Sequence, residues 1–212
     1  SGQFDLAMSM YRQLLSKQQK GTAEYAEILD LAAGALYKRA DNMKKSGNIT
    51  GAADLFKSIV NEYPESKVAD RGWFDAGVCY EEMKSLDAAA QTFELLPVKF
   101  PKSTLREKAF VRAAENYKSL NNLAKAAEVY QTAANTITKA DYAIPSLSNA
   151  SECYQKLNQF DMAGKMFEYI YERYSNDPKT PQALYNAGLI FEKGKLYENA
   201  INVYNALSVK FP

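Results

Sequence analysis

Histidine is absent from this chain of 212 residues, and that absence excludes several kinds of chemistry. Without an imidazole, no Ser-His-Asp or Cys-His catalytic site, two-histidine metal site or imidazole pH switch can form. Glycine-rich phosphate-binding loops are missing too, and the acidic pairs Glu81–Glu82 and Glu27 with Asp30 are typical of helix surfaces. We therefore expect no enzymatic activity, no cofactor and no bound metal ion.

Strong net charge and long apolar runs are also lacking. The chain has 26 basic and 25 acidic residues, which gives a formal net charge of +1. This balance provides no basic stripe for phosphates, so we expect no nucleic acid partner. Related helical repeats do read RNA one base per repeat, which leaves RNA binding as an alternative. No stretch of about 18 apolar residues occurs, so we expect no membrane span in this fragment.

What the chain does contain is a strict repeat of 37 residues. Alanines recur at this interval: Ala52, Ala89, Ala126, Ala163 and Ala200. An aromatic residue follows each alanine by four positions: Phe56, Phe93, Tyr130, Phe167 and Tyr204. Another ring precedes the last four alanines by nine positions: Tyr80, Tyr117, Tyr154 and Phe191. A repeat of this length is a supersecondary unit that stacks on its neighbours.

Within each repeat the apolar spacing predicts two helices with a short break between them. One face of the first helix is formed by Trp73, Ala76, Gly77 and Tyr80, and one face of the second by Leu86, Ala89, Phe93 and Leu96. The predicted break lies at Lys84–Ser85. Small residues in both helices let the two backbones approach closely, and the rings fill the space between layers.

Three further residues are expected to mark the starts and ends of helices. Ser103 is predicted to cap the helix that follows it. Pro97 falls late in a second helix and is expected to end or kink it. Pro145 is expected near the start of a helix, where a missing N–H is tolerated.

The repeat divides the chain into a half-repeat and full repeats. The half-repeat spans 1–18, and the full repeats span about 33–66, 70–103, 107–140, 144–177 and 181–212. Ala7 and Ala52 are 45 residues apart, so eight extra residues fall within about 19–33. We expect a longer loop or an elongated first helix there. Because the chain starts with Ser1 and partway through a motif, we expect one array excerpted from a longer protein.

The two cysteines, Cys79 and Cys153, are separated by 74 residues, or two whole repeats. Stacked helices spaced at about 8–10 Å would place them far beyond the Cα separation of about 7 Å that a disulfide tolerates. We expect two small core thiols that do not pair.

These columns resemble the tetratricopeptide repeat, whose pattern is W-x2-L-G-x2-Y, then A-x3-F, then P. Two repeats carry it, with Ala in place of Leu in both: Trp73, Ala76, Gly77, Tyr80, Ala89, Phe93 and Pro101, and Leu184, Ala187, Gly188, Phe191, Ala200, Tyr204 and Pro212. The resemblance implies an all-α fold, a right-handed superhelical α-solenoid of antiparallel helix pairs.

The longer period points to a narrower resemblance. The usual repeat has about 34 residues, and here three residues are added between repeats. This spacer and its (Y/F)-P-x-S signature resemble bacterial envelope repeat proteins of the outer-membrane assembly and Tol–Pal systems. The resemblance favours the periplasm or cell envelope over the cytoplasm.

The resemblance also implies a function, because tetratricopeptide arrays bind extended or helical segments of other proteins in a concave groove lined by the first helices. The groove columns carry the apolar residues Tyr37, Phe74, Val78, Val111, Tyr185 and Leu189, with Arg71 and Lys108 among their polar neighbours. They predict a non-catalytic protein–protein interaction scaffold that binds a partner peptide or helix. The alternative interpretations are that these charges form a solvated face while the rings pack locally, and that the chain is a self-assembling structural module.

The ends of the chain predict a self-contact. The N-terminus is a lone second helix, and the C-terminus stops at Pro212 without a solvating helix. Some of the apolar residues of the last helix and its approach are expected to be exposed, from the set Leu196, Tyr197, Val203, Tyr204 and Leu207. Because a stacked array normally needs a polar cap, this truncation favours end-to-end contact between chains.

Overall fold

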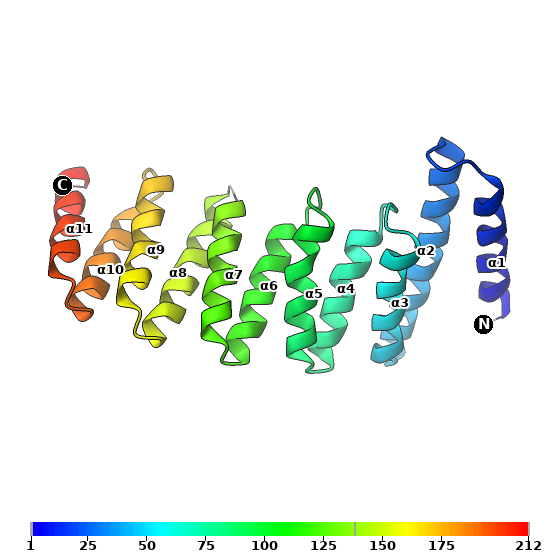
Figure 1. The fold of residues 1–212 in the computed structure, drawn as a ribbon, viewed down its shortest axis with the longest axis horizontal. Coiled ribbons are helices and arrows are strands. Elements are labelled where there is room, and N and C mark those ends of the chain that lie inside the picture. Colours follow the sequence, from blue (N-terminus) through cyan, green and yellow to red (C-terminus); the bar gives the residue numbers. More distant parts are fainter. Residues whose placement is uncertain (1, 138, 212) are drawn as a thin grey trace. The chain divides into compact units, whose positions relative to one another are not determined.

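The computed structural model describes residues 2–137 and 139–211, which form eleven α-helices and no β-strand within those ranges (Figure 1). In chain order the helices are α1 (Gly2–Lys17), α2 (Ala23–Lys45), α3 (Ile49–Glu62), α4 (Ala69–Glu82), α5 (Leu86–Lys99), α6 (Arg106–Ser119), α7 (Leu123–Thr136), α8 (Ala140–Lys156), α9 (Phe160–Arg173), α10 (Thr180–Lys193) and α11 (Tyr197–Lys210). This confirms the predicted all-α fold. Ser1, Thr138 and Pro212, which belong to the predicted repeats, lie outside the described residues.

The chain forms two compact units, one up to Ala109 and one from Phe110, so the division falls within α6. In the first unit each helix packs on the next from α1 to α5. In the second unit the same holds from α7 to α11. Consecutive helices run antiparallel in each unit (Figure 1). The interpretation of residues 1–212 as one array from a longer protein stays a prediction.

The second helix of each full repeat begins at the interval of the alanine column. These starts are Ile49, Leu86, Leu123, Phe160 and Tyr197. The alanines of the column are buried in all five helices, as are the rings of Phe56, Phe93 and Tyr130 four residues later. A small residue here lets neighbouring helices approach, and the ring one turn later fills the space.

Each turn between the helices of a full repeat contains one residue with a left-handed backbone. These residues are Gly47 (φ 87°), Lys84 (φ 60°), Asn121 (φ 57°), Asn158 (φ 57°) and Lys195 (φ 60°). The next N–H donates to a carbonyl five residues earlier, as from Ser85 to Tyr80 at 2.9 Å. This bond closes the first helix with a Schellman-type end. The break predicted at Lys84–Ser85 is confirmed.

The extra residues near the N-terminus elongate a helix. α2 has 23 residues, whereas α4 has 14. The longer helix begins after Thr22, whose hydroxyl oxygen accepts the N–H of Tyr25 at 3.2 Å. Its first turns project past the end of α3 (Figure 1). Of the two alternatives from the sequence, the elongated first helix is therefore correct.

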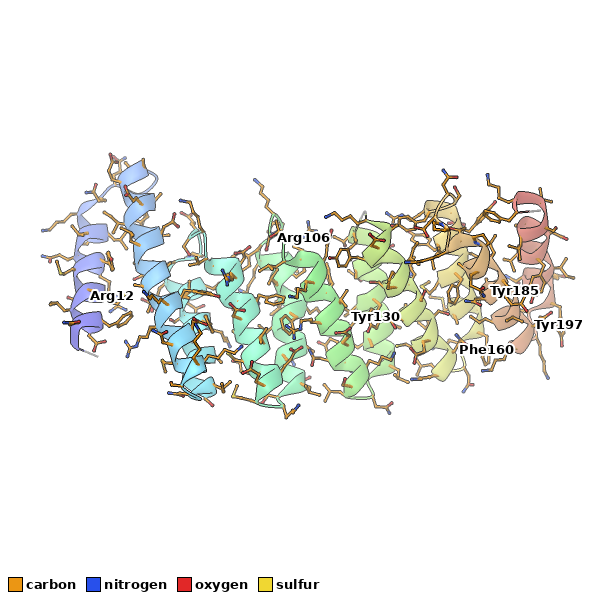
Figure 2. The ribbon with its side chains drawn as sticks, turned by 180° about the vertical axis from the view of Figure 1, so that it is seen from behind. Arg12, Arg106, Tyr130, Phe160, Tyr185 and Tyr197 are labelled. Atoms are coloured by element: carbon orange, nitrogen blue, oxygen red, sulfur yellow. The ribbon has the colours of Figure 1, made fainter. Side chains whose placement is uncertain are left out.

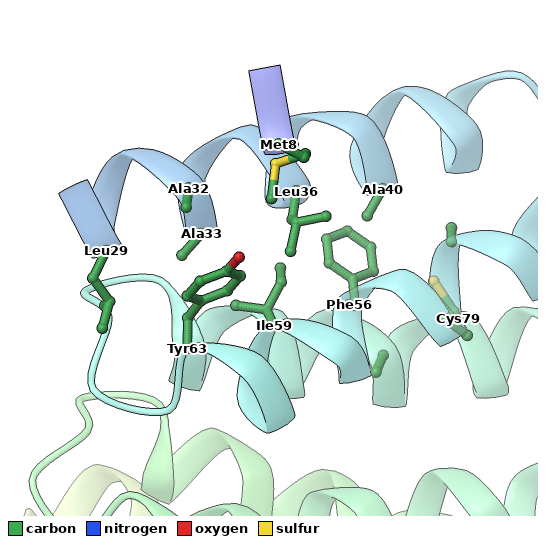
Figure 3. Close-up of a cluster of buried hydrophobic side chains, with 13 residues drawn as sticks. Met8, Leu29, Ala32, Ala33, Leu36, Ala40, Phe56, Ile59, Tyr63 and Cys79 are labelled. Atoms are coloured by element: carbon green, nitrogen blue, oxygen red, sulfur yellow. The ribbon is translucent and has the colours of Figure 1, made fainter. Parts of the chain in front are cut away.

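A cluster of buried side chains from α1 to α4 forms the core of the first unit (Figure 3). Met8 of α1 and Leu29 of the α2 extension join it, and Tyr63 lies at the end of α3. Cys79 is part of this cluster, and Cys153 is buried in the second unit. Both cysteines are free, which confirms the prediction that they do not pair.

The helix bounds correct the predictions for Pro145 and Ser103 and one of the two alternatives for Pro97, whose other alternative, a kink, stays a prediction. Pro97 does not end α5, which continues to Lys99, because a proline in the last turn removes only one N–H donor. Pro145 is the sixth residue of α8, since this helix begins at Ala140, four residues before the predicted repeat start. Ser103 precedes α6 and does not cap it: its hydroxyl oxygen accepts the N–H of Leu105 at 3.0 Å, and α6 begins at Arg106.

Candidate functional site

The groove column of the first helices begins at Tyr37 in α2. Its ring lies 5.1 Å from that of Phe56, and the Arg71 guanidinium lies 5.1 Å from the Tyr37 ring centroid. The Tyr37 hydroxyl donates to the carboxylate of Asp75 in α4. Burial, followed by this carboxylate, raises the pKa of Tyr37 well above its ordinary value. The side chain is therefore engaged by its own unit on three sides.

Phe74, the next residue of this column, is only 5% exposed. Its ring packs 5.1 Å from that of Phe93, and the Lys108 ammonium lies 5.3 Å from the Phe74 ring centroid. Val78, one turn later on α4, is half-buried. For Tyr37 and Phe74 the alternative of local packing describes the structure well, so these rings offer little surface to a partner.

Charged groups on this face pair between α2 and α4 and within α4. The Lys44 ammonium lies 2.7 Å from the Glu82 carboxylate, and Arg71, with 67% of its side chain exposed, lies 3.8 Å from Asp75. Such partly exposed pairs contribute little to stability. They do occupy the polar groups that border Tyr37, which leaves this face of the first unit internally paired.

The second unit presents a different surface. On α10, Tyr185 is 46% exposed and Leu189 is 43% exposed. Four residues separate them, so both lie on one side of the helix. Figure 2 labels Tyr185, whose ring centroid is 6.2 Å from that of Tyr204. Among the six apolar groove candidates these two are the exposed ones, since Val111 on α6 is half-buried.

Polar side chains of α6 and α8 lie near this column in the second unit. The ammonium groups of Lys118 and Lys156 lie 2.6 and 2.8 Å from the carboxylate of Glu152. Hydrogen bonds from Lys118 and then Lys156 lower the pKa of Glu152 below its ordinary value. Ser148 holds the position of Tyr185 one repeat earlier, and its hydroxyl donates to the Ile144 carbonyl at 3.0 Å. Lys156 is the more exposed of the two lysines, with 51% of its side chain exposed against 28% for Lys118.

The last helix differs in part from the sequence prediction. Tyr197, labelled in Figure 2, is 61% exposed. Val203 is only 3% exposed and is therefore not one of the open side chains. Leu196, Tyr204 and Leu207 are half-buried. Sequence reasoning missed Ile201, which is 58% exposed where the preceding repeat has Gly164. The sequence did carry a signal for Ile201, because the equivalent position of every earlier full repeat holds alanine or glycine.

Across 2–137 and 139–211, no three acidic or cysteine side chains gather as metal ligands. Of the helices in those ranges, none has the length and apolar character needed to cross a bilayer.

Comparison with protein families gives two matches. Residues 103–208 match the soluble NSF attachment protein family, and residues 34–66 and 72–103 match the tetratricopeptide repeat. The alanine column runs through all three regions at the same interval. Both matches therefore fall on copies of one helix-pair repeat. Among curated proteins, no relative of the chain is found.

Three solved structures illustrate the similar fold. MamA protein is 16% identical, with 84% of this chain and 91% of that chain covered and a TM-score of 0.52. A tetratricopeptide repeat protein from Parabacteroides merdae is 15% identical, with 85% and 67% covered and a TM-score of 0.53. BtubC from P. vanneervenii is 15% identical, with 98% and 90% covered and a TM-score of 0.50. At these identities the likeness shows the fold alone, a solenoid of helix pairs.

Proposed function

We propose a protein-binding scaffold function for this chain, which belongs to the soluble NSF attachment protein family and is built of tetratricopeptide repeats. Tetratricopeptide folds generally mediate protein–protein interaction without catalysis. The scaffold binds an extended or helical segment of a partner protein on the first helices of its repeats. The observation that carries this proposal is the exposed pair Tyr185 and Leu189 on α10.

Exposure separates these two residues from the other apolar groove candidates. Tyr37 is held by Asp75 and Arg71, and Phe74 is buried against Phe93. Tyr185 and Leu189 instead offer a ring and an aliphatic side chain one turn apart. Exposed aromatic and aliphatic anchors of this kind are what a bound peptide or helix covers. The second unit is therefore the proposed binding region, and α10 is its centre.

The charges beside this column favour one kind of partner segment. Lys156 keeps 51% of its side chain exposed while it contacts Glu152. A partner segment with an apolar residue over Tyr185 and an acidic residue toward α8 would complement both features. Charge complementarity of this kind contributes more to specificity and association rate than to affinity.

Site-specific photo-crosslinking tests the proposed surface. A benzophenone amino acid replaces Tyr185, and in a control it replaces Val98, which is 74% exposed on the second helix α5. We expect a partner protein that crosslinks at position 185 and not at 98, and that is lost when Leu189→Ser is added. The same crosslinked proteins at both positions would show that α10 is not the binding surface.

Two other functions predict different results in solution. A self-assembling module would show a mass that rises with concentration in light scattering, whereas a scaffold of this kind stays monomeric. Because Tyr197 and Ile201 are exposed on α11, the double substitution with serine separates end-to-end contact from any other association. RNA binding would appear as salt-dependent anisotropy of a labelled single strand.

The bacterial cell envelope is the proposed compartment. This part of the proposal rests on the added spacer residues and the Tyr-Pro and Phe-Pro signatures at 63–64 and 100–101. Cell fractionation of the native protein tests it, with recovery in the periplasmic or membrane fraction as the expected result. Recovery in the cytoplasmic fraction alone would contradict it without affecting the proposed binding surface.

A further inference from the structure

The elongated start of α2 forms a cleft that repeat stacking does not require. This cleft has a volume of about 720 Å³ and lies between the α1–α2 turn, the first turns of α2 and the segment that follows α3. It lies within the first unit and is separate from Tyr185 and Leu189. The first helices α4 and α10 have 14 residues each and pack in their repeats without such an extension.

One face of the extension is used for packing, and another is left open. Leu29 is 6% exposed and joins the buried cluster that contains Tyr63 (Figure 3). Leu31, in contrast, is 52% exposed and lines the cleft together with the exposed Ala26 and the half-buried Tyr25. The apolar part of the cleft is thus held in place by Leu29 and is available to solvent.

The charge of the cleft is negative. Its charged residues are Glu27, Asp30, Glu65 and Lys67, three carboxylates and one ammonium group. The Lys67 ammonium lies 2.7 Å from the Asp30 carboxylate, which also accepts the Lys67 backbone N–H at 2.9 Å. This pair is neutral and ties α2 to the segment after α3. The exposed carboxylates of Glu27 and Glu65 remain as the net charge of the site.

We propose that this cleft binds a short basic segment of a partner protein. An aliphatic side chain of the segment rests on Leu31 and Ala26, and its lysine or arginine side chains pair with Glu27 and Glu65. Two arguments select this occupant: the exposed apolar floor accepts a side chain, and the two carboxylates complement cations of opposite charge. The site is independent of the proposed binding surface on α10.

Fluorescence anisotropy with a defined probe tests the proposal. The probe is a fluorescein-labelled peptide in which two leucines are flanked by lysines. Two matched peptides replace the lysines with glutamates or the leucines with serines. The protein is compared with Glu27→Gln combined with Glu65→Gln, and with Leu31→Ser. Control variants carry matched changes at exposed positions of the second unit. Glu172→Gln with Glu198→Gln matches the glutamate pair, and Ile201→Ser matches Leu31→Ser.

The expected result is binding of the lysine–leucine peptide that weakens at least tenfold in each cleft variant and is unchanged in each control. Both matched peptides should bind at least tenfold more weakly than the probe. Circular dichroism should be the same for all variants, because every substituted side chain is exposed. Absence of binding, equal loss in cleft and control variants, or equal binding of the glutamate peptide would overturn the proposal.

Discussion

The ring of Phe191 in α10 occupies the space beside Gly164 in α9, and a Cβ atom at 164 would lie 2.4 Å from the ring carbon Cε1. Gly77 is related to Phe93 in the same way, at 2.7 Å, and Gly188 to Tyr204, at 2.2 Å. Three glycines thus mark places where an aromatic ring is seated directly against a helix backbone. Glycine is required there by packing and not by backbone conformation.

Gly164→Ala should therefore destabilise the second unit, because the added methyl group displaces the Phe191 ring. Overpacking of this kind typically costs about 1–3 kcal/mol. Gly34→Ala is the matched control, since no atom lies within 4 Å of a Cβ at this position in α2. There, alanine should stabilise the helix by about 0.5–1 kcal/mol. Urea unfolding measures the free energy of unfolding of both variants, which should fall for Gly164→Ala and rise for Gly34→Ala. A loss of stability for Gly34→Ala would contradict the packing argument.

Lys84→Gly should raise the free energy of unfolding. Lys84 has a φ of 60°, a left-handed conformation that costs a residue with a Cβ atom about 1 kcal/mol relative to glycine. Gly47 already holds the equivalent turn position in the preceding repeat. Ser46→Gly provides the control, because Ser46 has a φ of −84°. Glycine there adds unfolded-state entropy and removes the bond from the Ser46 hydroxyl to the Met43 carbonyl at 2.9 Å, so it should lower the free energy of unfolding. A gain of stability from both substitutions would show that the left-handed turn is not the cause.

Ala126→Leu should destabilise the second unit by about 1–3 kcal/mol through overpacking. Ala126 is completely buried in α7, and the equivalent position in every full repeat is alanine. The extra atoms have no room between the helices. Thermal unfolding followed by circular dichroism measures the change, and an unaltered melting temperature would show that this column is not an interhelical contact.

Cys79 should be inert toward thiol reagents in the folded protein. Burial raises the pKa of its thiol from 9.0 to about 11. The thiolate is the reactive form, so little of it is present in the fold at pH 8. Because the folded pKa is the higher one, the stabilising contribution of the protonated thiol is complete below pH 9 and is lost as the pH rises toward about 11.

Labelling with an aromatic disulfide reagent at pH 8 checks the reactivity of Cys79 in a Cys153→Ser variant. We expect slow labelling of the folded protein and rapid labelling in urea. Labelling at equal rates in both conditions would show that the thiol is accessible in the fold.

Tyr37 and Asp75 should be energetically coupled across two repeats. The Tyr37 hydroxyl donates to the Asp75 carboxylate, and hydrogen bonds to charged groups contribute about 1.5–3 kcal/mol when well buried. Both side chains are only partly buried, so we expect a coupling near the lower end of that range. A double-mutant cycle with Tyr37→Phe and Asp75→Asn measures it. Strictly additive effects would show that the bond does not contribute to stability.

The helix-pair repeat was determined by the sequence itself. The spacing of Ala89, Phe93 and Leu96 predicts one face of α5 because helical periodicity depends only on neighbouring residues. The same local rule identified the break before Leu86. It also detected the extra residues before Ala52, although spacing alone did not distinguish a loop from the longer α2.

Only the tertiary structure decided which groove residues stay open. Tyr37, Phe74 and Tyr185 occupy one sequence column, yet the first is held by Asp75, the second is buried and the third is exposed. Asp75 is 38 positions from Tyr37, so the spacing within one helix does not specify their contact. The cleft beside Leu31 arises in the same way, from the approach of the segment after α3 to the α2 extension. Exposure depends on side chains brought from other repeats, and those contacts exist only once the helices have stacked.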